Sequence, residues 1–290
     1  MLSDWIDAAR PKTLPAAVVP VTVGAAEAYR AGAFALWPTA VCLVFALLVQ
    51  IATNMANDYY DHIRGADTKD RLGPERLVAS GRISPRAMLW ASLGVFALAF
   101  FIGLNLVAYR DWYLLVVGIV SIVFGYGYTG GPFPLAYRGL GDVFVVLFFG
   151  LVATMGTYYV LVGELAISAA SLGLAIGLLA NNILVVNNYR DRDTDRAARK
   201  MTLIARWGLR FGRAQYWSQL AGAAGSLLAY AWLTDSVWAL LPLGAFPLGA
   251  KLAVDLGRTD GRALNGILAK SAGLVLLVGA LLAAGVVLSA

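Results

Sequence analysis

The 290-residue sequence has little cysteine and little histidine: Cys42 and His62 are the single residues of each type. A disulfide needs two cysteines, and Cys/His zinc sites and Cys–His catalytic pairs each need several such side chains. One chain of this composition therefore has no disulfide framework, no Cys/His zinc site and no catalytic Cys–His pair.

Charge is also scarce, since only 14% of the residues are Asp, Glu, Lys or Arg while 60% are hydrophobic. Soluble domains rarely reach such values. The net charge of +6 could indicate nucleic acid, but the apolar content favours a membrane, and we expect no nucleic-acid partner. The N-terminal segment MLSDWIDAARPKT carries acids and lacks the short apolar run of a cleavable signal peptide.

Long apolar segments follow one another along the whole chain. A helix needs about 20 mostly apolar residues to cross a bilayer. Pro15 and Pro20 interrupt the first segment, but membrane helices tolerate proline. We expect a single domain over residues 1–290, an all-α polytopic membrane protein with nine transmembrane helices, near 14–30, 38–60, 87–108, 112–129, 141–162, 167–189, 214–233, 237–254 and 269–289.

The basic residues give this arrangement an orientation. With the N-terminus inside, all but two of the 23 Lys and Arg residues, Arg30 and Arg110, fall on the cytoplasmic side. The positive-inside rule therefore predicts a cytoplasmic N-terminus. The two longest polar loops, 61–86 and 190–213, then form a cytoplasmic cap, and loops of this kind often carry function.

Two related motifs stand at the ends of the second and sixth segments. The first is NMANDYYDHIRGAD at 54–67, and the second is NNYRDRDTD at 187–195. A shift of 130 residues places Asn57 on Asn187 and Asp61 on Asp191. Both segments run the same way through the membrane, which favours a parallel repeat of about four helices.

The spacing of these residues predicts a metal site. Residues four and eight apart share one helix face, so Asn57 and Asp61 align, as do Asn187, Asp191 and Asp195. Clustered carboxylates repel one another in a low dielectric and need a cation. Oxygen ligands without His or Cys favour Mg²⁺, which shares its ligands with substrate phosphates. Nearby Lys and Arg side chains complete a predicted diphosphate site.

A plainer interpretation is that charges at the end of a membrane helix are solvated caps. Two copies of the pattern N-x-x-x-D, each in the last turns of an apolar segment, weigh against it for the motif acids. Asp193 and Asp70 fall off the shared face, and we expect them to be solvated.

The two motifs resemble the aspartate-rich motifs of the UbiA superfamily, the intramembrane aromatic prenyltransferases. Three further stretches are similar to the branch that prenylates 1,4-dihydroxy-2-naphthoate in menaquinone biosynthesis: ARPKTLPAAVVPVTVG at 9–24, YTGGPFPLAYRGLGDVFVVLFFG at 128–150 and RKMTLIARWG at 199–208. The later segments fit by length and apolarity only. One departure is Gly65, where many members carry a third acid; here Asp67 follows instead.

The resemblance implies a fold, a reaction and a location. Helices would surround a central cavity that opens sideways to lipid beneath the cytoplasmic loops, in a bacterial-type plasma membrane. A polyprenyl diphosphate would alkylate the naphthoate with Mg²⁺, losing diphosphate and CO₂ and giving a demethylmenaquinone.

The resemblance also implies a set of site residues. Mg²⁺, expected as two ions, would be held by Asn57, Asp58, Asp61, Asp67, Asp191 and Asp195. The predicted catalytic residues are Asp61, Asp191 and Asp195, with Asn187 or an acid not fully committed to the metal orienting the acceptor hydroxyl. The predicted diphosphate ligands are Arg64, Lys69, Arg138, Lys200 and Arg206.

Three further residues have two interpretations each. Tyr126 and Tyr128 stabilise an allylic cation or belong to an interfacial aromatic belt. Lys12 binds the carboxylate of the acceptor or serves only as a topology charge.

Two other functions stay open. The same chemistry could act on 4-hydroxybenzoate, homogentisate or a porphyrin-type acceptor. An ion-coupled transporter is less favoured, because transporter sites usually lie near the membrane midplane, whereas these acids lie at span ends.

Overall fold

Helices make up the regular structure of residues 2–67 and 71–290, the part of the chain that the computed structural model describes, and no strand occurs there. Two helices are short: α1 (Leu2–Ala9) and α9 (Arg192–Ala197). The longer ones are α2 (Pro15–Arg30), α3 (Leu36–Ile63), α4 (Pro85–Tyr109), α5 (Tyr113–Gly127), α8 (Ile167–Arg190), α10 (Leu203–Thr234) and α12 (Leu264–Val287). Two more are composite: α6 (Gly141–Val145) continues through a π-helix (Val146–Val152) into α7 (Ala153–Val162), and a 3-10 segment (Val237–Ala245) leads into α11 (Phe246–Leu256).

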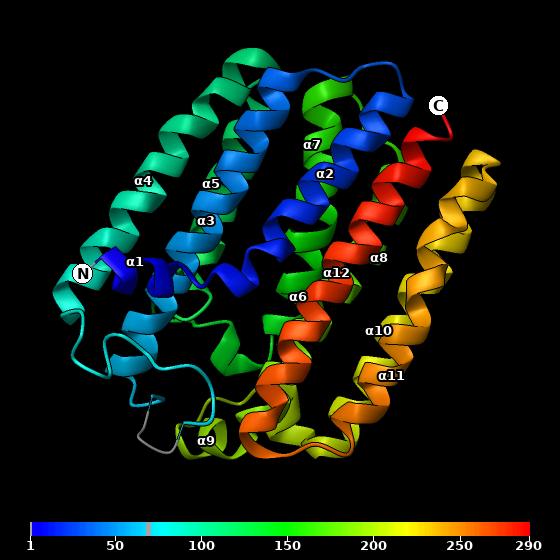
Figure 1. Cartoon of the computed structure of the whole chain (residues 1–290). Helices are drawn as coiled ribbons and strands as arrows, with labels where there is room; N and C mark the ends of the chain where they lie inside the picture. The colour runs from blue at the N-terminus through cyan, green and yellow to red at the C-terminus, as the bar shows by residue number, and fades with distance from the viewer. Residues whose placement is uncertain (1, 68–70) are drawn as a thin grey trace.

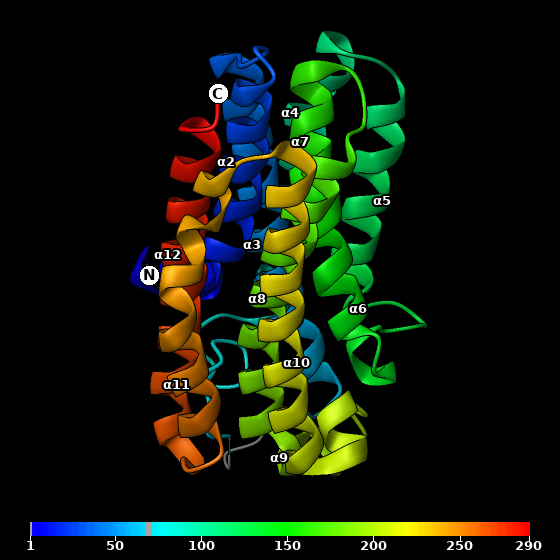
Figure 2. The ribbon, with the colours of Figure 1, turned by 90° about the vertical axis from the view of Figure 1, so that its right-hand side faces the viewer.

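The long helices stand side by side as a bundle, and α1 lies across them (Figure 1). The first and last long helices, α2 and α12, pack on each other. Figures 1 and 2 place α9 at one end of the bundle, away from the C-terminus. We call this the motif end, because the residues that follow α3 and α8 gather there.

Six segments are long and apolar enough to cross a membrane: Leu36–Ile63, Pro85–Tyr109, Gly141–Val162, Ile167–Arg190, Val237–Leu256 and Gly261–Val287. Large apolar side chains such as Trp232 (83% exposed) face outward, which suits a lipid environment. The chain is therefore an integral membrane protein. Within the described residues, α2, α5 and α10 lie over the three other predicted ranges. Helices α2 and α5 have only 16 and 15 residues, and α10 is not among the six segments that are long and apolar enough to cross a membrane. The count of nine spans stays a prediction.

Helix α8 is the centre of the bundle. It contacts α2, α7, α10 and α12, and 67% of the residues in its most apolar stretch are buried. Glycines on both sides allow the π-helix to approach α8 closely: a Cβ atom on Gly177 of α8 would lie 2.7 Å from the carbonyl oxygen of Val146, and one on Gly150 of the π-helix would lie 2.5 Å from that of Gly173. π-Helical turns often occur at functional sites, and this one directs Phe148 and Phe149 into a cavity described below.

The second motif is organised differently from the prediction of one continuous helix face. Helix α8 ends at Arg190, Asp191 caps it, and Asp195 lies on the separate helix α9. The predicted loop 190–213 contains helical segments, since α9 occupies Arg192–Ala197 and α10 begins at Leu203, with a kink at Gly208 (φ 84°). The side chain of Thr202 accepts a hydrogen bond from the backbone N–H of Ala205 and so caps α10.

Candidate active site

The two motifs meet at the motif end because α3 and α8 both finish there. In the first motif, Asp58 is buried and accepts hydrogen bonds from the backbone N–H groups of Leu77 and Val78, each at 3.2 Å. One bond goes to each carboxylate oxygen. Asp58 therefore holds the loop between α3 and α4 against the end of α3.

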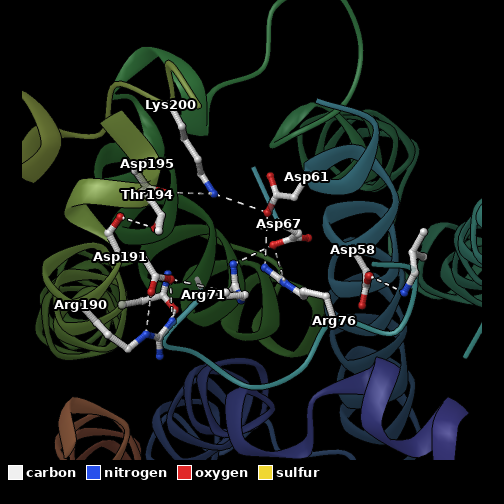
Figure 3. A network of polar contacts seen from close by, with 12 residues as sticks. Asp58, Asp61, Asp67, Arg71, Arg76, Arg190, Asp191, Thr194, Asp195 and Lys200 are labelled. Carbon is white, nitrogen blue, oxygen red and sulfur yellow. Dashed lines mark hydrogen bonds and ion pairs between the residues drawn. The ribbon is translucent and has the colours of Figure 1, made fainter. Parts of the chain in front are cut away.

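This loop delivers two arginines between the motif acids (Figure 3). Arg71 contacts Asp67 at 2.7 Å and Asp191 at 3.7 Å, so one guanidinium joins the two motifs. Arg76 contacts Asp61 at 3.3 Å and Asp67 at 3.4 Å. Because both arginines are largely buried, they neutralise acids that would otherwise repel one another in a poorly solvated site.

The second motif contains its own cation. The Arg190 guanidinium binds both oxygens of Asp191, at 2.7 and 2.6 Å. It also donates to the side-chain oxygen of Asn187 at 2.8 Å and to that of Asn265, on α12, at 2.7 Å. The fixed donor geometry of arginine suits such multiple contacts, and the cluster fixes the end of α8 to α12.

Lys200 joins the motifs from the opposite side of the site. Its ammonium group lies 3.4 Å from Asp61 and 3.9 Å from Asp195 (Figure 3). The hydroxyl of Tyr137 donates to the other oxygen of Asp61 at 2.9 Å, and Lys200 lies 5.5 Å from the centre of the Tyr137 ring. Asp61 thus has three partners from distant parts of the chain.

Protonation in this site departs from solution values. Burial, reinforced by nearby Asp61, raises the pKa of Asp67 from 3.8 to about 7. Burial also raises the pKa of Asp195 to about 7, although the charge of Lys200 opposes this rise. Burial by itself would lower the pKa of Lys200, but Asp61 and Asp195 outweigh it, so the pKa of Lys200 is raised. The lysine therefore stays protonated.

A polar pocket extends inward from these acids. Its wall includes Asn57 and Asp61 from α3, Asn187 from α8, and the side chains of Arg76 and Lys200. Arg10, Thr13 and Asn54 line a second side, and Tyr128, Thr129 and Asp142 line a third.

Behind the pocket lies an apolar cavity between α2, α3, α4, α5 and the helix that runs from α6 to α7. Its wall is almost entirely hydrophobic, with Phe45, Phe100, Phe144 and Phe148 among its residues. Five residues line both spaces: Gln50, Thr53, Tyr128, Val145 and Phe149. A polar chamber and an apolar chamber therefore adjoin, which suits a ligand with a charged head and a hydrocarbon tail.

Comparison with known proteins identifies the family. A model of the UbiA prenyltransferase family matches residues 17–265. The chain belongs to the UbiA prenyltransferase family. It is thus an enzyme of the prenyltransferase type, as the resemblance of the two motifs predicts.

Relatives of this UbiA family member cover almost the whole chain. The 1,4-dihydroxy-2-naphthoate octaprenyltransferase of Mycobacterium tuberculosis is 38% identical over 285 residues, which span 98% of this chain and 96% of the relative. The enzyme of the same name from Haemophilus influenzae is 37% identical over 262 residues, 87% of this chain and 85% of the relative. The structure of a UbiA homolog from Archaeoglobus fulgidus bound to GPP and Mg²⁺ has a TM-score of 0.69 and 16% identity, and the match covers 98% of this chain and 99% of that one. It shows that the fold is shared.

The structure of this UbiA member places several predicted site residues on the pocket and others away from it. Among the described residues, the pocket wall includes Asn57, Asp61, Tyr128, Asn187 and Lys200, and Asp67, Asp191 and Asp195 join the same ion-pair network. The predicted diphosphate ligand Lys69 lies outside the described residues.

Apart from the motif acids, five of the described predicted residues do not line the pocket: Lys12, Arg64, Tyr126, Arg138 and Arg206. Tyr126 instead hydrogen-bonds Tyr60 and packs on Phe96. The three arginines are exposed and tie loops together: Arg64 donates to the carbonyl of Gly131, and Arg206 donates to the carbonyls of Met201 and Arg138.

Sequence reasoning missed Arg10, Arg71, Arg76 and Tyr137. Arg71 and Arg76 lie in the predicted cap loop, where spacing carries no positional information. Arg10 has a left-handed backbone (φ 52°), which is rare for a residue other than glycine and is often found at functional sites. Its guanidinium donates to the backbone carbonyl of Asn54 at 3.2 Å, and it forms no ion pair with the residues that the structure describes. The motif RPKT draws attention to this segment, but to Lys12 rather than Arg10.

The acids fit a hard divalent cation by their chemistry. One carboxylate oxygen of Asp67 and one of Asp195 are buried without a hydrogen-bond partner, so each has a free acceptor. The donors are carboxylate and amide oxygens, as Mg²⁺ prefers. Within residues 2–67 and 71–290 no three acids come close enough to form a metal cluster by themselves, and the arginines supply the compensating charge between them.

The raised carboxyl pKa values predict how stability depends on pH. Because Asp67 and Asp195 bind protons more tightly in the folded chain than in the unfolded one, the Mg²⁺-free protein loses stability as pH rises from about 4 to about 7. Mg²⁺ binds the ionised acids. We therefore expect Mg²⁺ to raise the melting temperature in detergent by a few degrees more at about pH 8 than at about pH 5.

The control for this measurement is Asp67→Asn, which should flatten the pH dependence. Asp193→Asn, which alters an exposed acid bound to Arg192, should leave it as in the wild type. A melting temperature that rises with pH in the absence of Mg²⁺ would contradict the assignment of these pKa shifts.

Proposed function

We propose that the chain transfers a polyprenyl group from a polyprenyl diphosphate to 1,4-dihydroxy-2-naphthoate, releasing diphosphate and CO₂ and giving a demethylmenaquinol, the reduced form of a demethylmenaquinone. The observation that carries this proposal is the contact between two chambers: a pocket whose wall includes Asp61 and the cations Arg76 and Lys200 adjoins an apolar cavity. Relatives that cover nearly the whole chain carry the name 1,4-dihydroxy-2-naphthoate octaprenyltransferase.

The diphosphate of the donor belongs at the motif end. Asn57, Asp61 and Asp67 of the first motif, and Asp191 and Asp195 of the second, would hold Mg²⁺, expected as two ions. A structure with the same fold is described as bound to GPP and Mg²⁺. Bound Mg²⁺ supplies positive charge to the leaving diphosphate. Asp58 is not in this set, because it neither lines the pocket nor forms an ion pair with the described residues, and both of its oxygens accept backbone N–H groups of the loop between α3 and α4.

The chain's own cations act on the same group. Lys200 lines the pocket with a raised pKa and stays charged, and Arg76 lines it from the loop between α3 and α4. Both can neutralise the charge that develops on diphosphate oxygens as the allylic C–O bond breaks. Asn187 also lines the pocket and is our candidate for orienting the acceptor hydroxyl.

The tail of the donor belongs in the apolar cavity. Each CH₂ group that leaves water contributes about 0.8 kcal/mol, so a polyprenyl chain stays in lipid or in an apolar channel. The cavity wall also excludes water, which would otherwise quench an allylic cation. Tyr128 lines both chambers and is our candidate for stabilising that cation through its ring.

Arg10 is our candidate for binding the carboxylate of the acceptor. It lines the pocket, whereas Lys12 is exposed and does not. A guanidinium without an ion-pair partner can take a carboxylate with two parallel hydrogen bonds.

The distribution of basic residues supports a cytoplasmic N-terminus and nine spans, which would place the motif end in the cytoplasm. The bacterial relatives support a bacterial-type plasma membrane as the location. A protease-protection assay on intact cells and inverted vesicles tests this orientation through tags inserted after Arg30 and after Gly81, both at turns.

The reaction is tested by product identification. Purified protein in vesicles receives 1,4-dihydroxy-2-naphthoate and polyprenyl diphosphates of several lengths, with Mg²⁺ or with EDTA. We expect a prenylated, decarboxylated naphthoquinol by mass spectrometry, and only with Mg²⁺. Product formed from 4-hydroxybenzoate or homogentisate but not from the naphthoate would contradict the proposed acceptor. Ion flux across the vesicle membrane without any prenylated product would favour a transporter.

Two acids on α9 form a matched pair for the motif assignment. Asp195→Asn removes a buried charge of the site, and we expect kcat/KM to fall about 100-fold or more. Asp193→Asn removes an exposed charge two residues away, and we expect activity within about twofold of the wild type. Equal activity of the two variants would exclude Asp195 from the site.

Arg10 and Lys12 form a second pair. Arg10→Gln should raise the KM of the naphthoate about tenfold or more with little change in the KM of the donor, because one charged hydrogen-bond partner is lost. Lys12→Gln should change neither. A larger rise in the KM of the naphthoate for Lys12→Gln than for Arg10→Gln would instead assign Lys12 as the residue that binds the acceptor carboxylate.

A further inference from the structure

Asp142 is a buried acid that belongs to neither motif. It lies in the first turn of α6, inside the apolar segment Gly141–Val162, and is 6% exposed. Among the residues that the structure describes, no Lys, Arg or His forms an ion pair with it. An ionisable side chain in a membrane segment without a cation is costly, and its first interpretation is a functional one.

The carboxylate of Asp142 is held from behind and faces the pocket. Asn181 of α8 and Gln215 of α10 both donate to the same oxygen, Oδ1, at 3.2 and 2.6 Å. Neither of these two amides lines the pocket, whereas Asp142 does. The other oxygen, Oδ2, has no side-chain donor in the described part of the chain.

A second polar group lines the same pocket without a full set of partners. Gln50 of α3 is 7% exposed, and its amide N–H donates to the hydroxyl of Thr13 at 3.2 Å. Its oxygen, Oε1, is buried and has no hydrogen-bond partner. A buried acceptor left unpaired costs stability, so a hydroxyl group of a ligand in the pocket would be favourable here.

Asp142 and Gln50 lie at a similar depth below the motif acids. Asn181, the α8 partner of Asp142, lies ten residues before Asp191, a distance of about 15 Å along a helix. Gln50 lies eleven residues before Asp61, a distance of about 16 Å along a helix. We call these two residues the pocket floor. The diphosphate of the donor belongs at the motif end, so the space between this end and the floor is left for the reacting carbon and the acceptor ring.

We propose that Asp142 accepts a hydrogen bond from the ring hydroxyl of the acceptor that is remote from the acceptor's carboxylate, and that the pocket floor thereby selects dihydroxy aromatic acids. This assignment rests on the proposed function. In 1,4-dihydroxy-2-naphthoate that group is the 4-hydroxyl, since the 1-hydroxyl is adjacent to the carboxylate and bonds it internally.

The two ends of the acceptor fix its orientation in the same way. Arg10, on the wall of the same pocket, takes the carboxylate of the acceptor, so the remote hydroxyl is the group left for Asp142. A hydrogen bond to an ionised acceptor is strong and increases the electron density of the ring that attacks the allylic carbon.

A purely structural role for Asp142 makes a different prediction. The bonds from Asn181 and Gln215 tie α6, α8 and α10 together, and an asparagine could accept both of them. If this tie were its whole function, Asp142→Asn would keep it and would affect every substrate alike.

The test is a comparison of two acceptors in two proteins. Wild type and Asp142→Asn receive 1,4-dihydroxy-2-naphthoate or 1-hydroxy-2-naphthoate with the same polyprenyl diphosphate and Mg²⁺. We expect Asp142→Asn to lower kcat/KM for the dihydroxy acid about 10- to 100-fold and to change it little for the monohydroxy acid. The KM of the donor should stay the same. The two rings differ in intrinsic reactivity, but this difference cancels when kcat/KM of the variant is divided by kcat/KM of the wild type for the same acceptor.

Glu27→Gln is the matched control, because Glu27 is another buried acid of an apolar helix. It is paired with Arg30, accepts hydrogen bonds from Ser168 and Tyr230, and lines neither the pocket nor the cavity. We expect it to lower thermal stability without changing the ratio between the two acceptors.

Equal losses on both acceptors in Asp142→Asn would overturn the assignment, and so would a wild type that uses the monohydroxy acid as well as the dihydroxy acid. The second result needs no variant, so it decides even if Asp142→Asn does not fold. A wild type that prenylates neither acid would instead contradict the proposed function.

Discussion

The site depends on the neutralisation of carboxylates that are buried at the end of an apolar bundle. Asp61 and Asp67 of the first motif lie far in the sequence from Asp191 of the second, and without cations between them these acids would repel one another. Arg71 supplies the contact that spans both motifs, at 2.7 Å from Asp67 and 3.7 Å from Asp191. The loop that carries Arg71 and Arg76 is in turn anchored by Asp58. The first motif thus contributes to the site in two ways. It supplies acids, and it positions the loop whose arginines neutralise those acids.

The parts that follow from local rules were predictable from the sequence. Apolar length predicts the membrane helices, and a spacing of four places Asn57 and Asp61 on one face of α3, as the structure has them. The same rule fails at Asp195, because α8 ends at Arg190 and α9 starts a new axis. Polar residues near a helix end do not reveal whether the helix continues, since capping and tertiary contacts decide it.

The contribution of each basic residue was not predictable, because it depends on where a loop folds. Arg64, Arg138 and Arg206 lie near the motifs in sequence, yet they bond carbonyls or rings at the surface. Arg10 is distant from both motifs in the sequence. It lines the pocket because α1 crosses the bundle and the backbone of Arg10 adopts a left-handed conformation there. A count of positive charges therefore predicts the topology of such a protein but does not identify its ligand contacts.

The polar groups of the pocket divide into two sets with opposite requirements. At the motif end, ionised side chains are matched by cations, and the free oxygens of Asp67 and Asp195 suit a further cation. At the pocket floor, the side-chain donors that Asp142 has among the described residues are two amides, and Gln50 has an unpaired oxygen, so both suit a hydroxyl donor. A substrate that places charge at one end and a hydroxyl at the other satisfies both sets at once. The separation along α3 and α8, rather than the motif acids alone, then decides which aromatic ring reaches the reacting carbon.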